Sequence, residues 1–311
     1  MTDTSVWQRF LGLFRRDKSA GGDKGGAAVK GGAATKGRGA GKAAAGKAGA
    51  GKGGAGQGGV GKGSQARAGR SQPSGKPGRR ADADRQQPVL GLAATKDGWV
   101  GAVLDAAGHG TPAIVQATTV TEAVEAAGTV TVVALDVPLG LPDESRRAAD
   151  VEARKFLGKQ AAVVTGTPVR EAVYAGSFSE ANAINRERIG SGLSQQVYDL
   201  LRRIMEVDTY VRQDLPFVLV ETLPEAAYTE LAGDPLTSRR RTAPGNTERR
   251  ELLAGAGIFA PTTAPTGVAT EDMLDACAAA WSAHRVKLGE ARTLPERPER
   301  FSDGLDAAIH L

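Results

Sequence analysis

The chain of 311 residues contains one cysteine, Cys277. A single cysteine excludes an intramolecular disulfide framework and is typical of proteins in a reducing compartment, so we expect a cytoplasmic location. No stretch reaches the apolar length of a membrane span, and the apolar run near the N-terminus is too short and too interrupted for a signal peptide. The sequence therefore predicts neither a disulfide-rich secreted domain nor an integral membrane protein.

Acidic and aliphatic residues are scarce in the first part of the chain. Residues 1–87 contain 18 Lys/Arg and 5 Asp/Glu, whereas the remaining residues contain 22 Lys/Arg and 30 Asp/Glu. The two parts thus have net charges of +13 and −8, a split that the overall charge of +5 conceals. Residues 1–87 also hold 23 of the 42 glycines and cannot bury enough apolar surface to offset the loss of chain entropy. We expect a disordered basic Gly/Ala/Lys-rich tail, residues 1–87, followed by one folded domain, residues 88–311.

The predicted tail has two features that indicate partners. Trp7, Phe10, Leu11 and Phe14 recur at helical spacing. Residues 6–16 therefore predict a short amphipathic helix that contacts a membrane surface or a protein, with a frayed terminus as the alternative. The repeats that follow space single positive charges along a flexible chain. They predict binding to a polyanion such as nucleic acid or acidic lipid that weakens with salt, with a linker that only aids solubility as the alternative.

The spacing of apolar residues predicts the order of elements in the folded part. Strands are expected at Pro88–Ala94, Trp99–Leu104, Ala113–Thr118, Thr131–Asp136 and Phe217–Glu221. Helices are expected at Thr121–Ala127, from Glu144 to about Arg212 and at Asp272–Leu288. This β-β-β-α-β-α-β-α order predicts the α/β ribonuclease H (RNase H) arrangement. We therefore expect a mixed five-stranded sheet, strand order 3-2-1-4-5, flanked by helices and carrying a helical insertion.

Four carboxylates are predicted to converge in this arrangement. Asp136 and Glu221 end two parallel strands, at the edge where open α/β sheets place their chemistry. Asp272 and Asp275 are three residues apart on the last helix and so share one face. Carboxylate oxygens are the ligands that Mg²⁺ and Mn²⁺ prefer. We therefore expect all four to be catalytic, and Asp136, Asp272 and Asp275 to bind Mg²⁺ or Mn²⁺.

Each carboxylate also has a structural interpretation, and the sequence leaves both open. Asp272 could be a first-turn acid that complements the helix dipole behind the capping residue Thr270. Asp136 could cap the loop that follows its strand, and Glu221 could pair with an arginine of the helical insertion. Asp275 lies deeper in its helix, where the dipole explains it less well.

Arginines could supply the complementary charge. Arg147 and Arg154 share a helix face with Asp150, and Arg240 and Arg241 lie in an arginine-rich run. Guanidinium groups suit phosphates, so these four arginines are candidate phosphate-binding residues. The alternative is a solvated surface of ion pairs.

Six segments, taken in chain order, resemble one known family. They are "VALDVPLGLP", "RRAADVEARKFLG", "GLSQQVYDLLRRIMEVD", "VETLPEAAY", the Ser-Arg-Arg-Arg-Thr run and "EDMLDACAAAWSA". Together they resemble the predicted RNase H-like nuclease family, a bacterial and archaeal family classified as domain of unknown function 429. The resemblance covers residues 88–311 and leaves out the tail. It implies an RNase H fold and a metal-dependent nuclease activity on nucleic acid.

The resemblance also assigns positions. The aspartate of the family's Ile-Asp-Ile-Pro-like motif falls on Asp136, and the acidic pair of the C-terminal helix falls on Asp272 and Asp275. The Glu-x-x-Pro-Glu motif begins at Glu221 and ends at Glu225. A histidine is common two residues into that motif, where this chain has leucine.

The opening motif departs from the family pattern. Against Gly-Val-Asp-Gly-Cys-x-Gly-Gly-Trp, Gly91, Gly98 and Trp99 match, but Ala93 stands where the aspartate is expected. The resemblance implies that this aspartate bridges both metals beside Asp136, so its loss removes a charge and up to two ligand oxygens. We therefore expect a degenerate centre with one weakly bound metal or none, and nuclease activity near background. The alternative is a non-catalytic nucleic-acid-binding or regulatory module tethered by the basic tail.

Overall fold

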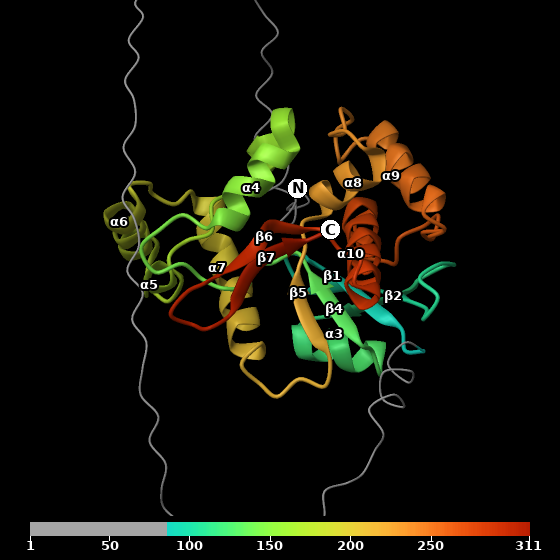
Figure 1. Cartoon of the computed structure of the whole chain (residues 1–311), viewed down its shortest axis with the longest axis horizontal. Helices are drawn as coiled ribbons and strands as arrows, with labels where there is room; N and C mark the ends of the chain where they lie inside the picture. Colours follow the sequence, from blue (N-terminus) through green and yellow to red (C-terminus); the bar gives the residue numbers. More distant parts are fainter. Residues whose placement is uncertain (1–85) are drawn as a thin grey trace, which may run out of the picture. The chain divides into compact units, whose positions relative to one another are not determined.

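The computed structural model describes residues 86–311, and the predictions for the tail and its amphipathic start lie outside these residues. Seven strands form one mixed sheet flanked by helices (Figure 1), which confirms the mixed α/β class. The strands are β1 (Val89–Ala94), β2 (Trp99–Leu104), β3 (Ala113–Ala117), β4 (Val132–Leu135), β5 (Val218–Glu221), β6 (Thr293–Arg300) and β7 (Asp306–His310). Their order in the sheet is β3-β2-β1-β4-β5-β7-β6.

The helices lie mainly between β3 and β6 in the sequence. They are α3 (Val120–Ala127), α4 (Ala148–Leu157), η1 (Gly158–Val163), α5 (Arg170–Val173), α6 (Phe178–Ile189), α7 (Gln195–Tyr210), α8 (Pro224–Ala232), α9 (Ala243–Gly255) and α10 (Thr270–Leu288). The expected helical region from Glu144 is thus divided into α4, η1, α5, α6 and α7. Within residues 86–311, no helix is long and apolar enough to cross a membrane.

The sheet extends further than the sequence predicts. Its first part follows the predicted order, because β1 pairs antiparallel with β2 and parallel with β4, and β4 pairs parallel with β5. Beyond β5, however, β7 pairs parallel with β5 and β6 pairs antiparallel with β7. The prediction of a five-stranded sheet was therefore wrong. The sequence of β6, TLPERPER, has two prolines, and half of its residues are charged. An edge strand tolerates such a composition, but the composition gives no strand signal in the sequence.

Helices α8 and α9 were also not expected from the sequence. Each has a proline in its first turn, where the missing N–H is not needed. Helix α9 is further capped by Thr242, whose hydroxyl accepts a hydrogen bond from Gly245 N–H at 3.2 Å. Together with α10 they gather on one side of the sheet in Figure 1, away from α5, α6 and α7.

Helix α10 packs very closely on β1. A Cβ atom added at Gly91 would lie 2.0 Å from Ala280 N and 2.3 Å from Ala276 O, so only glycine allows this approach. A Cβ atom at Gly108, which follows β2, would instead meet the ring of His284. Helix α10 therefore runs antiparallel to β1, with its first turns at the carboxyl end of that strand. Because side chains alternate along a strand, Ala93 shares with Gly91 the face that α10 covers.

The opposite face of the sheet is covered by α3 and α7. Trp99 Nε1 donates a hydrogen bond to Glu206 of α7 at 3.2 Å, and the same carboxylate accepts from Val120 N–H at 2.6 Å. Arg203 lies over the Trp99 ring at 5.9 Å. Both faces are thus covered, and β1 is a buried inner strand between β2 and β4.

Candidate functional site

Asp136 follows β4 directly and lies beside β1. The parallel register pairs Leu92 with Leu135, and Asp136 N–H donates to Leu92 O at 3.2 Å. The next residues in register are therefore Ala93 and Asp136. One oxygen of the Asp136 carboxylate accepts a hydrogen bond from Ala94 N–H at 2.8 Å. The structure thus places the buried Asp136 side chain next to the methyl group of Ala93, as the predicted strand order implies.

Asp272 and Asp275 lie in the first two turns of α10 and share one cation, Arg240. Arg240 Nε donates to Asp275 Oδ2 at 2.7 Å, and Arg240 Nη2 donates to Asp272 Oδ1 at 2.9 Å and also to Asp275 Oδ2. All three side chains are buried. Asp136 is close enough for its pKa to respond to Asp275, Arg240 and Asp272. We call Asp136, Arg240, Asp272 and Asp275 the carboxylate–arginine centre.

Burial decides the protonation of this centre. It raises the pKa of Asp136 well above the ordinary value, although the hydrogen bond from Ala94 N–H acts in the opposite direction. Burial likewise raises the pKa of Asp275 to about 7, with Arg240 opposing the shift. The pKa of Asp272 is also raised by burial. Near neutral pH the centre therefore holds a guanidinium cation and carboxyls that are not all ionised.

This arrangement does not fit a two-metal site. The guanidinium of Arg240 donates hydrogen bonds to both Asp272 and Asp275, so carboxylate oxygens that would bind a metal are already engaged. Among residues 86–311, no three His, Cys, Asp or Glu side chains are grouped so that they could hold a metal ion. Arg240 Nη1 is buried without a hydrogen-bond partner among the described residues, and the bonds of this guanidinium run through Nε and Nη2 to the two aspartates. The metal-binding role of Asp136, Asp272 and Asp275 stays a prediction.

In the described part of the chain, helix α10 begins without a side-chain cap hydrogen bond. Its N-cap residue is Ala269, and the expected cap Thr270 is already the first helical residue. Asp272 lies in the first turn, where a negative charge complements the helix dipole, but it also bonds Arg240. The dipole and the ion pair therefore both act on Asp272.

Glu221 lies in a different ion-pair network. Its Oε2 accepts from Arg147 Nη2 at 2.7 Å and from Leu139 N–H at 2.8 Å. Arg147 is fully buried and also donates to Thr167 Oγ1 at 3.2 Å. Burial raises the pKa of Glu221 to about 7, against the opposing effect of Arg147. The structure thus shows Glu221 paired with an arginine at the start of the helical insertion, and its catalytic role stays a prediction.

The four candidate phosphate-binding arginines differ in accessibility. Arg147 and Arg240 are buried against carboxylates and cannot reach an external phosphate in this arrangement. Arg241 is partly exposed, with Nε 4.0 Å from Glu271 Oε1. Arg154 is exposed on α4. Of the four, Arg154 and Arg241 are therefore the ones that an outside ligand can contact.

A further buried ion pair, between Glu225 and Arg249, lies near the carboxylate–arginine centre and was not predicted from the sequence. Both carboxylate oxygens of Glu225 accept from Arg249 Nη2, each at 2.8 Å. Arg249 is fully buried and also donates to Gly245 O at 3.2 Å. Glu225 is near enough to raise the pKa of Asp275. The Glu-x-x-Pro-Glu motif indicated Glu225, but its partner is 24 residues further along the chain and gives no local signal.

Fold and site together define an α/β protein with a buried cluster of carboxylates at the carboxyl ends of its central strands. The family model described as "Protein of unknown function (DUF429)" matches residues 91–300. The chain belongs to this family. The match begins in β1, ends with β6 and includes every residue of the carboxylate–arginine centre. No curated protein and no solved structure matches the chain significantly.

Proposed function

We propose that residues 88–311 form an RNase H-like domain that binds nucleic acid and whose carboxylate–arginine centre is a degenerate nuclease centre. The sheet order β3-β2-β1-β4-β5 supports the fold assignment, since these five neighbouring strands have the spatial order of the RNase H arrangement. The acid that follows β4, Asp136, and the acids in the first two turns of α10, Asp272 and Asp275, support the nuclease ancestry. They approach each other at the carboxyl ends of central strands.

One observation carries the proposal of degeneracy. Arg240 bonds both acids of α10, while Ala93 occupies the strand position beside Asp136. Two-metal hydrolysis requires carboxylates that bridge and hold both ions so that attacking and leaving oxygens are clamped. A single delocalised positive charge on Arg240 neutralises the acids but leaves no open coordination position for water and phosphate. The centre thus preserves an acidic cluster as a structural ion-pair network, and phosphodiester hydrolysis is near background.

The test is a Mn²⁺-dependent cleavage assay on single-stranded DNA, duplex DNA, RNA and an RNA–DNA hybrid. The unmodified protein is expected to cleave near background on all four. Ala93→Asp restores the missing carboxylate, and combining it with Arg240→Gln frees the acids of α10, so the double variant is expected to cleave fastest. Asp97→Asn removes an exposed carboxylate near the same strand and serves as the control. Robust cleavage by the unmodified protein that is abolished by Asp136→Asn would contradict the proposal.

The alternative function is a module with no catalytic activity at all. Cleavage that stays at background in the double variant, with folding intact by circular dichroism, would favour it. The fold assignment would survive that result, because it depends on the sheet and not on the activity.

A further inference from the structure

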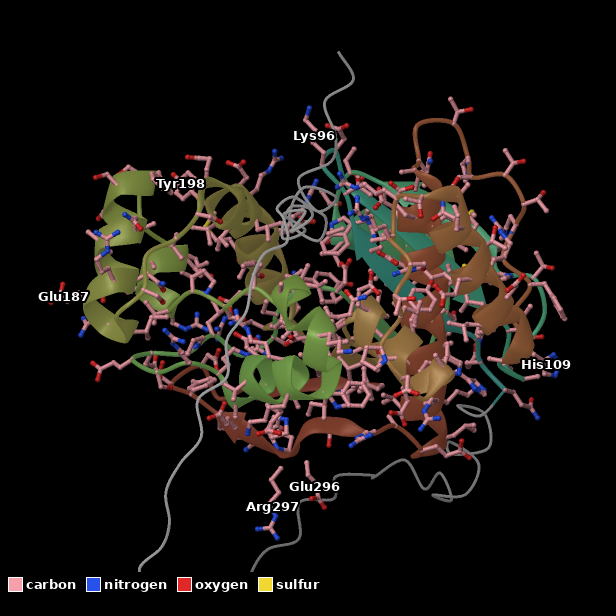
Figure 2. The ribbon with its side chains drawn as sticks, turned by 90° about the horizontal axis from the view of Figure 1, so that it is seen from above. Lys96, His109, Glu187, Tyr198, Glu296 and Arg297 are labelled. Carbon is pink, nitrogen blue, oxygen red and sulfur yellow. The ribbon has the colours of Figure 1, made fainter. Side chains whose placement is uncertain are left out.

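A cleft of about 680 Å³ opens between α4 and the segment that joins α6 to α7. Arg146, Arg154 and Lys155 line it on the α4 side, and Ser191, Gly192 and Ser194 line it on the opposite side. Figure 2 shows α6 and α7, marked by Glu187 and Tyr198, on one side of the molecule with α4 next to them. A volume of this size is within the range of about 300–1,000 Å³ that is typical of small-ligand sites.

The accessible charge of the cleft is positive. Arg146 and Arg154 are exposed, and neither side chain has a hydrogen bond or ion pair within residues 86–311. Lys155 pairs with Glu152 at 2.6 Å, an exposed pair that contributes little because water screens it. The acid that lines the cleft, Asp150, is buried and accepts hydrogen bonds from Thr167 N–H at 2.7 Å and from its hydroxyl. An incoming anion therefore meets two unpaired guanidinium groups and no free carboxylate.

Below its basic rim the cleft is largely apolar. Val151, Val164, Ile189, Leu193 and Val197 contribute to its walls. Such walls accept the faces of bases, whereas the guanidinium groups at the rim suit phosphates, which they can bind through two parallel hydrogen bonds. A ligand with alternating phosphates and flat apolar rings matches both parts.

The cleft also leads toward the carboxylates. It shares Asp150, Val197 and the segment 164–167 with a smaller inner cavity of about 50 Å³, which Asp136 and Glu221 line. The inner cavity is too small for a base and has room for only a few water molecules. A strand in the outer cleft would thus hold its phosphates at the basic rim and its bases against the apolar walls, on the side that leads to the carboxylates.

We propose that this cleft binds a single-stranded nucleic-acid segment of about two nucleotides, with its phosphates on Arg146, Arg154 and Lys155. The choice of nucleic acid as ligand rests on the proposed function, but the binding requires neither a metal ion nor catalysis. Single strands fit and duplexes do not, because a duplex keeps its bases paired and cannot turn them to the walls. The cleft would then present a strand end or an unpaired segment to the centre.

The test is isothermal titration calorimetry of the full chain with a 5′-phosphorylated thymidine dinucleotide. EDTA in the buffer removes divalent metal and so prevents turnover. Arg146→Glu and Arg154→Glu are expected to weaken binding about tenfold each, since each removes a phosphate contact and adds a repulsive charge. Arg297→Glu is the matched control. Arg297 is an exposed arginine of β6 without a partner within the described residues, and Figure 2 shows it projecting into solvent away from α4. It is expected to change binding less than twofold.

The contrary outcomes are distinct. An equal loss in Arg297→Glu would mean that diffuse charge binds the probe, and no loss in any variant would place binding in the tail; either result overturns the proposal. Equal affinity for inorganic phosphate or for a short blunt duplex would overturn the assignment of a single strand. Because EDTA removes the metal, a negative titration does not test the degenerate-nuclease proposal. Conversely, a cleavage assay that contradicts that proposal does not change a positive titration result.

Discussion

Arg240 sets the charge of the carboxylate–arginine centre, since it is the cation bonded to both acids of α10. Replacing it with glutamine leaves Asp272 and Asp275 buried without a positive partner. Breaking a buried ion pair in this way costs about 3–5 kcal/mol when the acids must stay ionised. The acids can instead take up protons, because burial already raises the pKa of Asp275 to about 7. The cost therefore depends on pH.

We predict that Arg240→Gln destabilises the protein more at pH 8 than at pH 5.5. In the variant the pKa values of the aspartates rise further, so the folded state binds more protons than the unfolded state and stability falls as pH rises. Urea unfolding at the two pH values measures the difference. Arg241→Gln, at a partly exposed neighbour, is the control and should show little pH dependence. Equal losses at both pH values would show that the aspartates stay ionised without Arg240.

The pKa of Asp208 is shifted downward, whereas that of Asp275 is shifted upward. Burial acts to raise the pKa of Asp208, but hydrogen bonds from Arg170, Tyr174 and Arg212 prevail and lower it from 3.8 to about 2. A lowered pKa contributes stability that is present above the ordinary pKa and is lost as pH falls toward 2.

We therefore predict that Asp208→Asn destabilises the protein at pH 7, by on the order of 1–3 kcal/mol. The gap between this variant and the unmodified protein should narrow as pH falls from 4 to 2, because protonation of Asp208 then begins in the unmodified protein as well. Unfolding midpoints measured across that range test the prediction. A gap that stays constant down to pH 2 would mean that packing, and not the ionised carboxylate, explains the effect.

At the scale of residues, the sequence predicted that Asp136, Asp272 and Asp275 lie close together, but it did not predict that Arg240 pairs with two of them. Asp136, Asp272 and Asp275 were identified because their positions at a strand end and on one helix face are local properties. Arg240 was identified only as a candidate for phosphate. Its pairing with acids more than 30 residues away depends on how the segment before α9 crosses α10, and no spacing in the sequence encodes that. Glu221 lies outside the carboxylate–arginine centre for a similar reason, because its partner, Arg147, is 74 residues away in the sequence.

At the scale of elements, the contact of β1 with α10 positions the candidate site. Gly91→Ala adds a methyl group 2.0 Å from Ala280 N, a backbone atom that no rotamer change can move. The helix would have to shift away from β1, and overpacking of this kind typically costs about 1–3 kcal/mol. We expect a lower thermal midpoint for this variant.

The control for that prediction is Gly255→Ala. A Cβ atom there meets nothing within 4 Å, and the position lies at the end of α9, where alanine favours the helix. We expect no loss of stability for Gly255→Ala. A similar loss in both variants, or none in Gly91→Ala, would contradict the close approach of α10 to β1.

Elements with regular apolar spacing could be predicted, and those without it could not. The strands β1, β2, β4 and β5 and the helix α10 lie within a few residues of their predicted bounds. Strand β6 was missed because its charged and proline residues suit an exposed edge. Strand β7 was missed because its sequence, DAAIH, has one large apolar residue and therefore no clear apolar run. Helix α9 was missed because glycine, proline and charged residues obscure its apolar face.

At the scale of the whole molecule, the basic segment and the acidic domain have opposite charge. The segment 1–87 carries +13 and the remainder −8, so polyanion binding is expected to reside in the segment, with the cleft adding a local contact. Removing residues 18–87 should abolish salt-sensitive retention on immobilised duplex DNA, which the cleft does not accept, because the released counterions scale with the positive charges in contact. Unchanged retention would assign binding to the domain.

The start of the chain makes a separate prediction. If residues 6–16 form an amphipathic helix that contacts a membrane surface or a protein, deleting residues 1–16 should relocate the protein in the cell while its DNA retention persists. Fluorescence microscopy of tagged full-length and shortened chains measures this. An unchanged distribution would leave the aromatic residues at this end without a role in localisation.

The central claim is that Arg240 and Ala93 together prevent two-metal binding at this centre. Mn²⁺ binding by calorimetry at pH 7.5 tests it most directly, with Asp136→Asn subtracting ions bound elsewhere. The account predicts at most one weakly bound Mn²⁺ for the unmodified protein and two for Ala93→Asp combined with Arg240→Gln, because that variant restores the bridging carboxylate and frees both acids of α10. Two tightly bound Mn²⁺ ions in the unmodified protein, lost in Asp136→Asn, would contradict it.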